Sequence, residues 1–173
     1  MDNSELRALF ERLRSGDEEA FRKIYGEMKT PVFTVIMRTL QQWETAEDVF
    51  QDLFVKLYVS PPEPHVSDVC AYIFRMARNM SVDVLRRERR FQSIEESDEY
   101  TYDDGSDPLL RLDIEAAMRT LPLVESQIVT LHLTGGLKFR EVADIVSMPL
   151  GTVLGRYRKA IKKLRTLLMG GTL

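Results

Sequence analysis

Cationic side chains gather in two short stretches of the sequence, and both could bind phosphate. The first holds four arginines within five residues, namely Arg86, Arg87, Arg89 and Arg90. The second holds six basic residues within positions 156–165, and no acidic residue follows Asp144. Because guanidinium groups present a fixed fork of donors that matches phosphate, a polyanion is the partner these residue types favour. A cation at a helix C-terminus also gains about 0.3–1 kcal/mol from the helix dipole, so a structural role stays open for part of the first stretch.

Residue types that support catalysis are sparse in this sequence. It has one cysteine, Cys70, and two histidines, His65 and His132, and these do not stand at metal-ligand spacing. No glycine-rich phosphate loop occurs, and the carboxylates fall on predicted solvent faces or in an acidic segment. We therefore expect no enzyme activity, no metal, no cofactor and no small-molecule substrate.

The same composition predicts the compartment. A lone cysteine provides no disulfide framework and fits a reducing, intracellular setting. The N-terminal residues alternate charge with apolar positions, unlike a signal peptide, and no run approaches the roughly 20 apolar residues of a membrane span. We expect a cytoplasmic protein that does not insert into a membrane.

An acidic segment divides the chain. Residues 92–107 contain seven acidic residues and no basic one, and Pro108 follows them, which is typical of a linker. Apolar residues recur at helical spacing on both sides, without an alternating strand pattern. The chain has 173 residues, 44% of them apolar, which is enough for two small packed domains. We expect an all-α protein with helical domains over residues 1–91 and 109–173, joined by a linker over residues 92–108.

Capping residues indicate where helices of the first domain begin. One helix is predicted after a cap at Asp17, with Pro31 as a candidate kink. Its apolar face comprises Phe21, Ile24, Tyr25, Met28, Val32 and Val35 or Ile36. A second helix is predicted from the capping-box spacing of Thr45 and Asp48. A third is predicted to start near Ser67 and to run into the arginine cluster.

Two predicted helix faces in this domain are polar. The second helix leaves Asp48, Gln51 and Asp52 for solvent or a partner, and on charge alone a solvated face is the better interpretation. The third helix packs an apolar face that includes Tyr72. It leaves polar residues outside, namely Arg75, Arg78, Asn79 and Asp83.

The second domain has the spacing of a helix-turn-helix. "VESQIVTLHL" predicts a short helix, "FREVADIV" a second, and "LGTVLGRYRKAIKKLR" a longer basic helix after the turn "SMP". Ala143 stands where two helices approach closely, and Val153 can fill the space beneath it. The residues expected on the outside of the last helix are Arg156, Tyr157, Lys159, Lys162 and Lys163.

Four segments together resemble the extracytoplasmic-function (ECF) class of bacterial sigma factors, two-domain members of the sigma-70 family. "GDEEAFRKIYGEM" and "AEDVFQDLFVKLY" resemble the first core helices, and "AYIFRMARNMSVDVLRRERR" resembles the promoter-melting helix. "LPLVESQIVTLHLTGGLKFREVADIVSMPLGTV" resembles the C-terminal domain. The order of these segments around an acidic linker makes the likeness specific.

The resemblance implies a subunit for transcription initiation whose first domain is sigma region 2. In the family, this domain docks on the clamp helices of RNA polymerase, here through Asp48, Gln51 and Asp52. It also recognises and melts the minus-ten promoter element, with cations holding the backbone and amide or aromatic groups contacting exposed bases. The residues that match this role are Tyr72, Arg75, Arg78, Asn79, Arg86, Arg87, Arg89 and Arg90.

The second domain would be sigma region 4, which contacts the polymerase flap and reads the minus-thirty-five element in the major groove. Arg156 is the first candidate for a base contact, because arginine can bind guanine bidentately. The remaining candidates are Thr152, Tyr157, Lys159, Lys162 and Lys163, with the lysines as phosphate contacts. The resemblance also implies an anti-sigma factor as a partner, a linker that threads toward the polymerase active centre, and no homo-oligomer.

The chain departs from the family pattern at four positions. Leu154 and Gly155 replace a basic residue and a serine, Ser147 replaces a turn glycine, and Tyr72 stands where tryptophan is common. These changes bear on recognition of the minus-thirty-five element. Two other functions stay open from the sequence: a stand-alone helix-turn-helix regulator, and an acidic helical adaptor whose DNA-binding unit is vestigial.

Overall fold

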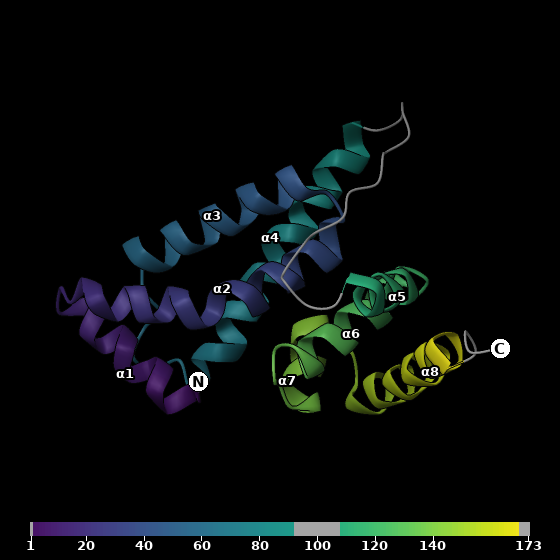
Figure 1. The fold of residues 1–173 in the computed structure, drawn as a ribbon. Helices are drawn as coiled ribbons and strands as arrows, with labels where there is room; N and C mark the ends of the chain where they lie inside the picture. The colour runs from purple at the N-terminus through teal and green to yellow at the C-terminus, as the bar shows by residue number, and fades with distance from the viewer. Residues whose placement is uncertain (1, 92–107, 170–173) are drawn as a thin grey trace. The chain divides into compact units, whose positions relative to one another are not determined.

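A computed structural model describes residues 2–91 and 108–169, without the side chains of residues 88–91 and 108–113. The described chain is all-α, as predicted, and forms eight helices in two compact units (Figure 1). The first unit contains α1–α4 and the second contains α5–α8. Of the predicted linker over residues 92–108, residues 92–107 lie outside the described residues and Pro108 is the first residue of α5. The limits of the two domains stay a prediction.

α2 is the central helix of the first unit. The unit comprises α1 (Asn3–Arg14), α2 (Glu18–Leu40), α3 (Trp43–Val59) and α4 (Val69–Phe91), and α2 packs against each of the other three. Its core side chains include Phe10 of α1, Ile24 and Ile36 of α2, Leu53 of α3 and Phe74 of α4, all of them buried. α1 was not predicted from the sequence, because the alternating charged and apolar residues at the N-terminus were used only as evidence against a signal peptide.

Aromatic rings join α2 to α3. Tyr25 meets Phe54 edge to face with 4.9 Å between ring centroids, and Phe33 meets Trp43 in the same way at 4.9 Å. Such pairs add about 0.5–1.5 kcal/mol each beyond the area they bury. Tyr25 was predicted to be a core position, but the residue is 39% exposed to solvent. Contacts between aromatic rings therefore hold α3, which carries the polar face, against α2.

The predicted helix starts were right for α2 and wrong for α3. The Asp17 carboxylate accepts from the backbone N–H groups of Glu19 and Ala20, and α2 continues through Pro31. α3 begins at Trp43, two residues before the predicted Thr45 box, and its cap Gln42 makes no side-chain capping bond. Since Thr45 is already inside the helix, its hydroxyl donates to Gln42 Oε1 instead of closing a box.

Three side chains of α1 hold the segment that leads into α4. Asn3 Nδ2 donates to the carbonyl of Ser67, and Asn3 Oδ1 accepts from the N–H of Val69 at 2.8 Å. Arg7 and Arg14 donate to backbone carbonyls in the same segment, those of Pro64 and Pro62. α4 thus starts two residues after the predicted Ser67, at a position fixed partly by a helix that lies more than sixty residues earlier.

The second unit is built around α8. It comprises α5 (Pro108–Arg119), α6 (Leu123–Leu133), α7 (Phe139–Val146) and α8 (Leu150–Met169), and α8 contacts the other three. Val153 is fully buried and Ala143 is 6% exposed, as expected for a close helix crossing. α5 was not singled out from the sequence, although Met118 near its end belongs to the core cluster with Ala160 and Leu164 of α8.

The turn between α7 and α8 requires a left-handed residue. Ser147 caps α7 with φ 56° and ψ 48°, and its N–H donates to the Ala143 carbonyl. A glycine adopts this conformation without a steric penalty, which explains physically why glycine suits this position and why serine is a departure. The turn still forms, so α7 and α8 have the predicted helix-turn-helix connection.

Candidate nucleic-acid interface

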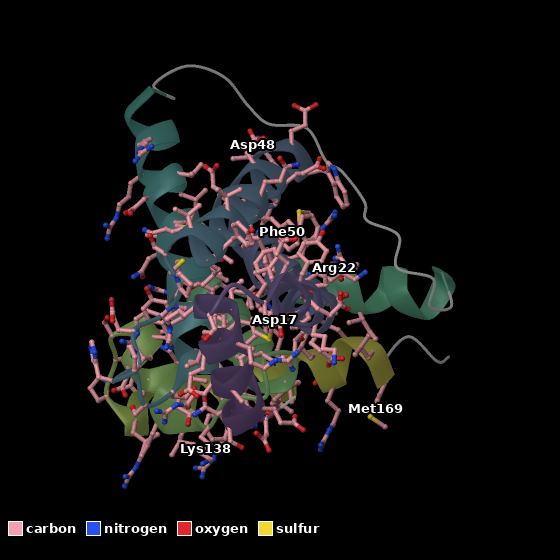
Figure 2. All side chains as sticks on the ribbon, turned by 90° about the vertical axis from the view of Figure 1, so that its left-hand side faces the viewer. Asp17, Arg22, Asp48, Phe50, Lys138 and Met169 are labelled. Carbon is pink, nitrogen blue, oxygen red and sulfur yellow. The ribbon has the colours of Figure 1, made fainter. Side chains whose placement is uncertain are left out.

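The polar face of α3 is exposed as predicted. Asp48, Gln51 and Asp52 all lie on the solvent side of α3, whereas Leu53 on the opposite side is fully buried. Figure 2 shows Asp48 at the outside of the unit and Phe50 among the packed side chains. Three polar residues spaced by three and four positions share one helix face, so they can contact a partner together.

α4 presents the predicted minus-ten residues with unequal exposure. Arg75 and Asn79 are exposed, Tyr72 and Arg78 are only partly exposed, and Arg87 is exposed. The side chains of Arg89 and Arg90 lie outside the described part of the structure. α4 therefore supplies both exposed donors and a partly buried ring on one helix, while the proposed role of each residue stays untested.

Arg78 differs from the exposed arginines of α4. Burial lowers the pKa of Arg78 below its ordinary value, and the positive charge of Arg86 lowers it further. The Arg86 guanidinium lies 3.5 Å from the Asp83 carboxylate, but both side chains are mostly exposed and the pair contributes little to stability. The arrangement concentrates positive charge around α4, which favours a polyanion.

Three of the predicted α8 residues have partners within the protein. Arg156 Nη1 lies 4.0 Å, and Lys159 Nζ 3.8 Å, from Oε1 of Glu125 on α6. Lys163 Nζ donates to the Thr120 carbonyl just after α5. Sequence reasoning missed Glu125 and Thr120, because both lie far from α8 along the chain and each belongs to another element.

Tyr157 was expected outside, but the structure places it partly inside. Its ring meets His132 edge to face at 5.2 Å and Phe139 at 4.8 Å, and it packs against the core cluster. His132 stacks on Phe139 at 4.0 Å, and its Nδ1 lies 2.8 Å from the Leu137 carbonyl oxygen. Tyr157 thus joins α8 to the last turn of α6 and the first turn of α7.

The predicted site omitted two exposed cations of α8. Arg158 and Arg165 lie on the same face as Lys162, at steps of four and three residues, and all three are exposed. We call Arg158, Lys162 and Arg165 the outer basic stripe. Among residues 114–169 these three side chains make no ion pair. The helical spacing of Arg158 and Arg165 from Lys162 was enough to predict this stripe from the sequence. Thr152, the remaining predicted residue of α8, is also exposed.

Within the described residues, 2–91 and 108–169, no group of three or more His, Cys, Asp or Glu could hold a metal ion. None of the described helices combines the length and apolar character needed to cross a bilayer.

Family models match both units. The model "Sigma-70 region 2" matches residues 24–91, and the model "Sigma-70, region 4" matches residues 111–164, which together are well over half of the chain. The chain is a sigma factor of the sigma-70 family. The region 2 match begins inside α2, so α1 of this sigma factor lies outside the matched residues.

Curated relatives along nearly the whole chain place it in the ECF class of this family. The ECF RNA polymerase sigma factor SigK of Mycobacterium tuberculosis is 26% identical over 177 residues, covering 96% of this chain and 95% of SigK. The ECF RNA polymerase sigma factor RpoE of Cereibacter sphaeroides is 27% identical over 178 residues, covering 95% of each chain. The likeness extends over nearly the full length of each protein.

Solved structures share the fold. The sigma factor RpoE of Bartonella quintana, determined with the anti-sigma factor NepR, superposes with a TM-score of 0.74 at 19% identity, covering 87% of this chain and 98% of RpoE. CnrH, determined with the cytosolic domain of CnrY, gives a TM-score of 0.68 at 21% identity, covering 97% and 99%. At these identities the likeness concerns the fold alone.

Proposed function

We propose that this sigma factor binds core RNA polymerase and directs it to a specific set of promoters. The observation that carries the proposal is the presence of sigma region 2 and region 4, in that order, on two separately packed helical units. A stand-alone helix-turn-helix regulator would not need the region 2 unit. The adaptor alternative predicts no transcription, so an initiation assay separates it.

Region 2 has two surfaces in this proposal. The exposed α3 face of Asp48, Gln51 and Asp52 docks on the polymerase clamp helices. The α4 residues Tyr72, Arg75, Arg78, Asn79, Arg86, Arg87, Arg89 and Arg90 engage the minus-ten element as its strands separate. Support comes from the exposure of Arg75 and Asn79 and from the positive charge around Arg78.

Region 4 reads the minus-thirty-five element with α8 in the major groove and contacts the polymerase flap. Leu154 is partly exposed and Gly155 is exposed, and neither provides a side-chain donor for DNA. The proposed contacts therefore come from Thr152, Arg156, Tyr157, Lys159, Lys162 and Lys163, with the outer basic stripe added for phosphate. Arg156 lies beside Glu125, with Nη1 4.0 Å from Oε1, and its side chain is 40% exposed.

Three further features belong to this proposal. Sigma factors are initiation factors without catalysis of their own, and we infer that this chain likewise has no enzyme activity and acts in the cytoplasm. An anti-sigma factor holds it inactive until a signal arrives. The support is that structural neighbours of this fold were determined with anti-sigma factors or with a partner's cytosolic domain.

In-vitro transcription tests the function. The full chain is added to core RNA polymerase of the organism that encodes it, with a library of that organism's promoters, and start sites are sequenced. We expect discrete new start sites that share an upstream element. Binding to core polymerase without new starts would contradict promoter-directed initiation, and the absence of core binding would contradict the sigma function itself.

A matched variant pair tests the role of the α3 face. Asp48→Asn removes a charge from the proposed polymerase contact, whereas Glu27→Gln removes an exposed charge on α2 outside that contact. We expect weaker core binding for Asp48→Asn and unchanged binding for Glu27→Gln, measured by titration of labelled chain with core polymerase. Equal losses in both variants would point to net charge instead of a docking surface.

A further inference from the structure

Glu125 places a buried carboxylate against the recognition helix. Its side chain is 4% exposed, and its Oε1 lies within 4.0 Å of both Arg156 and Lys159 of α8. Burial of a carboxylate is unfavourable unless opposite charge compensates for it. Glu125 also lies in the first turn of α6, where the helix dipole favours a negative charge. The carboxylate is thus held in place beside two proposed DNA contacts.

The two cations beside Glu125 differ from the outer basic stripe. Arg158, Lys162 and Arg165 make no ion pair among residues 114–169, so their charge is fully available to a phosphate. Arg156 is 40% exposed and Lys159 is 78% exposed, so both can still reach a ligand. When either cation binds a DNA phosphate, it exchanges the Glu125 carboxylate for another anion. The net gain in electrostatic attraction is therefore small.

We propose that Glu125 is an internal competitor of DNA in region 4, which attracts Arg156 and Lys159 and thereby weakens binding to promoter and random DNA. The inference rests on the proposed function. On random DNA the two cations gain only phosphate, which does not outweigh the Glu125 charge. At the promoter element, base-edge acceptors in the major groove provide hydrogen bonds in addition to those of phosphate. The transfer of the two cations from Glu125 to DNA therefore becomes favourable.

Glu125→Gln tests the competition, because it keeps the shape and removes the charge. We expect binding of the full chain to a random duplex to strengthen about threefold to tenfold at about 0.1 M salt. The slope of log affinity against log salt should steepen by about 1–2, since each added phosphate contact contributes roughly 0.9. Binding to the promoter duplex should strengthen at least as much, because the two cations leave Glu125 in that complex and the variant removes the whole cost of doing so.

Asp144→Asn is the matched control. Asp144 is an exposed carboxylate of α7, so this variant changes the net charge equally without touching the α6–α8 contact. We expect little change in its salt slope. If Asp144→Asn and Glu125→Gln shift the slope equally, the effect is one of net charge and the proposal is overturned. A lower melting temperature with an unchanged slope would also overturn it, because that result describes a structural role.

A second pair of variants decides the matter even if Glu125→Gln does not fold. Lys159→Gln and Lys162→Gln each remove one exposed cation of α8, three residues apart. Since Lys159 is partly neutralised by Glu125, Lys159→Gln should reduce the salt slope on random DNA less than Lys162→Gln does. Equal reductions by the two variants would overturn the proposal.

Transcription separates this inference from the proposed function. If the reconstituted holoenzyme initiates at discrete promoters while Glu125→Gln leaves the affinities for the promoter and random duplexes unchanged, only the role of Glu125 is wrong. If holoenzyme with the unaltered chain yields no discrete starts, the proposed function is wrong, whatever the DNA-binding variants show.

Discussion

Asp17 is a single carboxylate that both starts α2 and closes the turn after α1. Its Oδ1 accepts from the N–H groups of Glu19 and Ala20, and its Oδ2 accepts from Arg12 Nε at 2.9 Å. The hydrogen bond from the Arg12 side chain is the main reason that the pKa of Asp17 lies below its ordinary value of 3.8. The capping role was predictable from sequence, and the Arg12 contact was not.

The lowered pKa predicts how Asp17 affects stability with pH. Because the folded pKa lies below the unfolded one, the stabilisation is present above pH 3.8 and is lost as the pH falls through the folded pKa. In Asp17→Asn, which keeps an oxygen for the cap, the free energy of unfolding should fall less steeply with acid. Urea unfolding at a series of pH values down to about pH 3 measures this. Parallel curves for the two proteins would contradict the prediction.

Gly155 is a residue whose replacement by alanine should stabilise the second unit. It lies inside α8, is exposed, and has no atom within 4 Å of the position that a Cβ would occupy. Gly155→Ala should therefore raise the free energy of unfolding by about 1 kcal/mol, the difference in helix propensity between the two residues. Chemical denaturation followed by circular dichroism measures the change.

Gly136 provides the control for Gly155. A Cβ at Gly136 would also meet open space, but its φ of 67° is left-handed. Gly136→Ala should lower the free energy of unfolding by about 1 kcal/mol, because a side chain disfavours that conformation. If both alanine variants shifted stability in the same direction, backbone conformation would not explain the difference.

At the scale of elements, α1 acts as a clamp on the start of α4. Asn3 bonds the Ser67 carbonyl and the N–H of Val69, so its removal leaves both backbone groups without this partner. Asn3→Ala should lower the free energy of unfolding of the first unit by about 1–2 kcal/mol, the typical cost of losing side-chain hydrogen bonds to backbone groups. Fluorescence of Trp43, the one tryptophan of the chain, reports on this unit during urea unfolding.

Ser4→Ala serves as the neighbouring control for Asn3. The Ser4 hydroxyl donates to Asp2 in its own helix turn and does not join α1 to α4. We expect its effect on stability to be within about 0.5 kcal/mol, as for most surface substitutions. Equal losses in Asn3→Ala and Ser4→Ala would show that fraying of α1, and not the clamp, determines the cost.

Elements were predictable where their signals are local. The Asp17 cap, the polar face of α3 and the turn before α8 all depend on residues within one or two helix turns, and these were predicted. The Thr45 box was wrong because the sequence pattern also allows an earlier start at Trp43. The contacts of Asn3 with Val69 and of Glu125 with Arg156 join distant elements, so no local pattern contains them.

At the scale of the whole molecule, the acidic net charge conceals a basic second unit. Residues 108–173 contain ten Lys and Arg against five Asp and Glu, a net charge of +5, whereas the whole chain has a net charge of −3. The difference is mostly the seven acidic residues of positions 92–107. DNA responds to the local field of α8, so a negative total does not prevent binding.

This uneven charge predicts that the acidic segment weakens DNA binding by the free chain. Replacement of all seven acids within residues 92–107 by their amides changes the net charge from −3 to +4 without a change in length. At low salt, where the Debye length approaches 30 Å, affinity for random DNA should rise by up to about tenfold.

The salt dependence of the affinity gain, and a control with acids replaced elsewhere in the chain, distinguish the effect of the acidic segment from an effect of total charge. The gain should shrink as salt increases, since at about 0.15 M the Debye length is only about 8 Å. Amide replacement of the same number of exposed acids on α1–α3 keeps the net charge change but moves it away from the segment adjoining α5. If that control gains as much affinity for random DNA, the total charge controls binding and the acidic segment has no special role. If neither variant gains affinity, the uneven charge has no effect on DNA binding by the free chain.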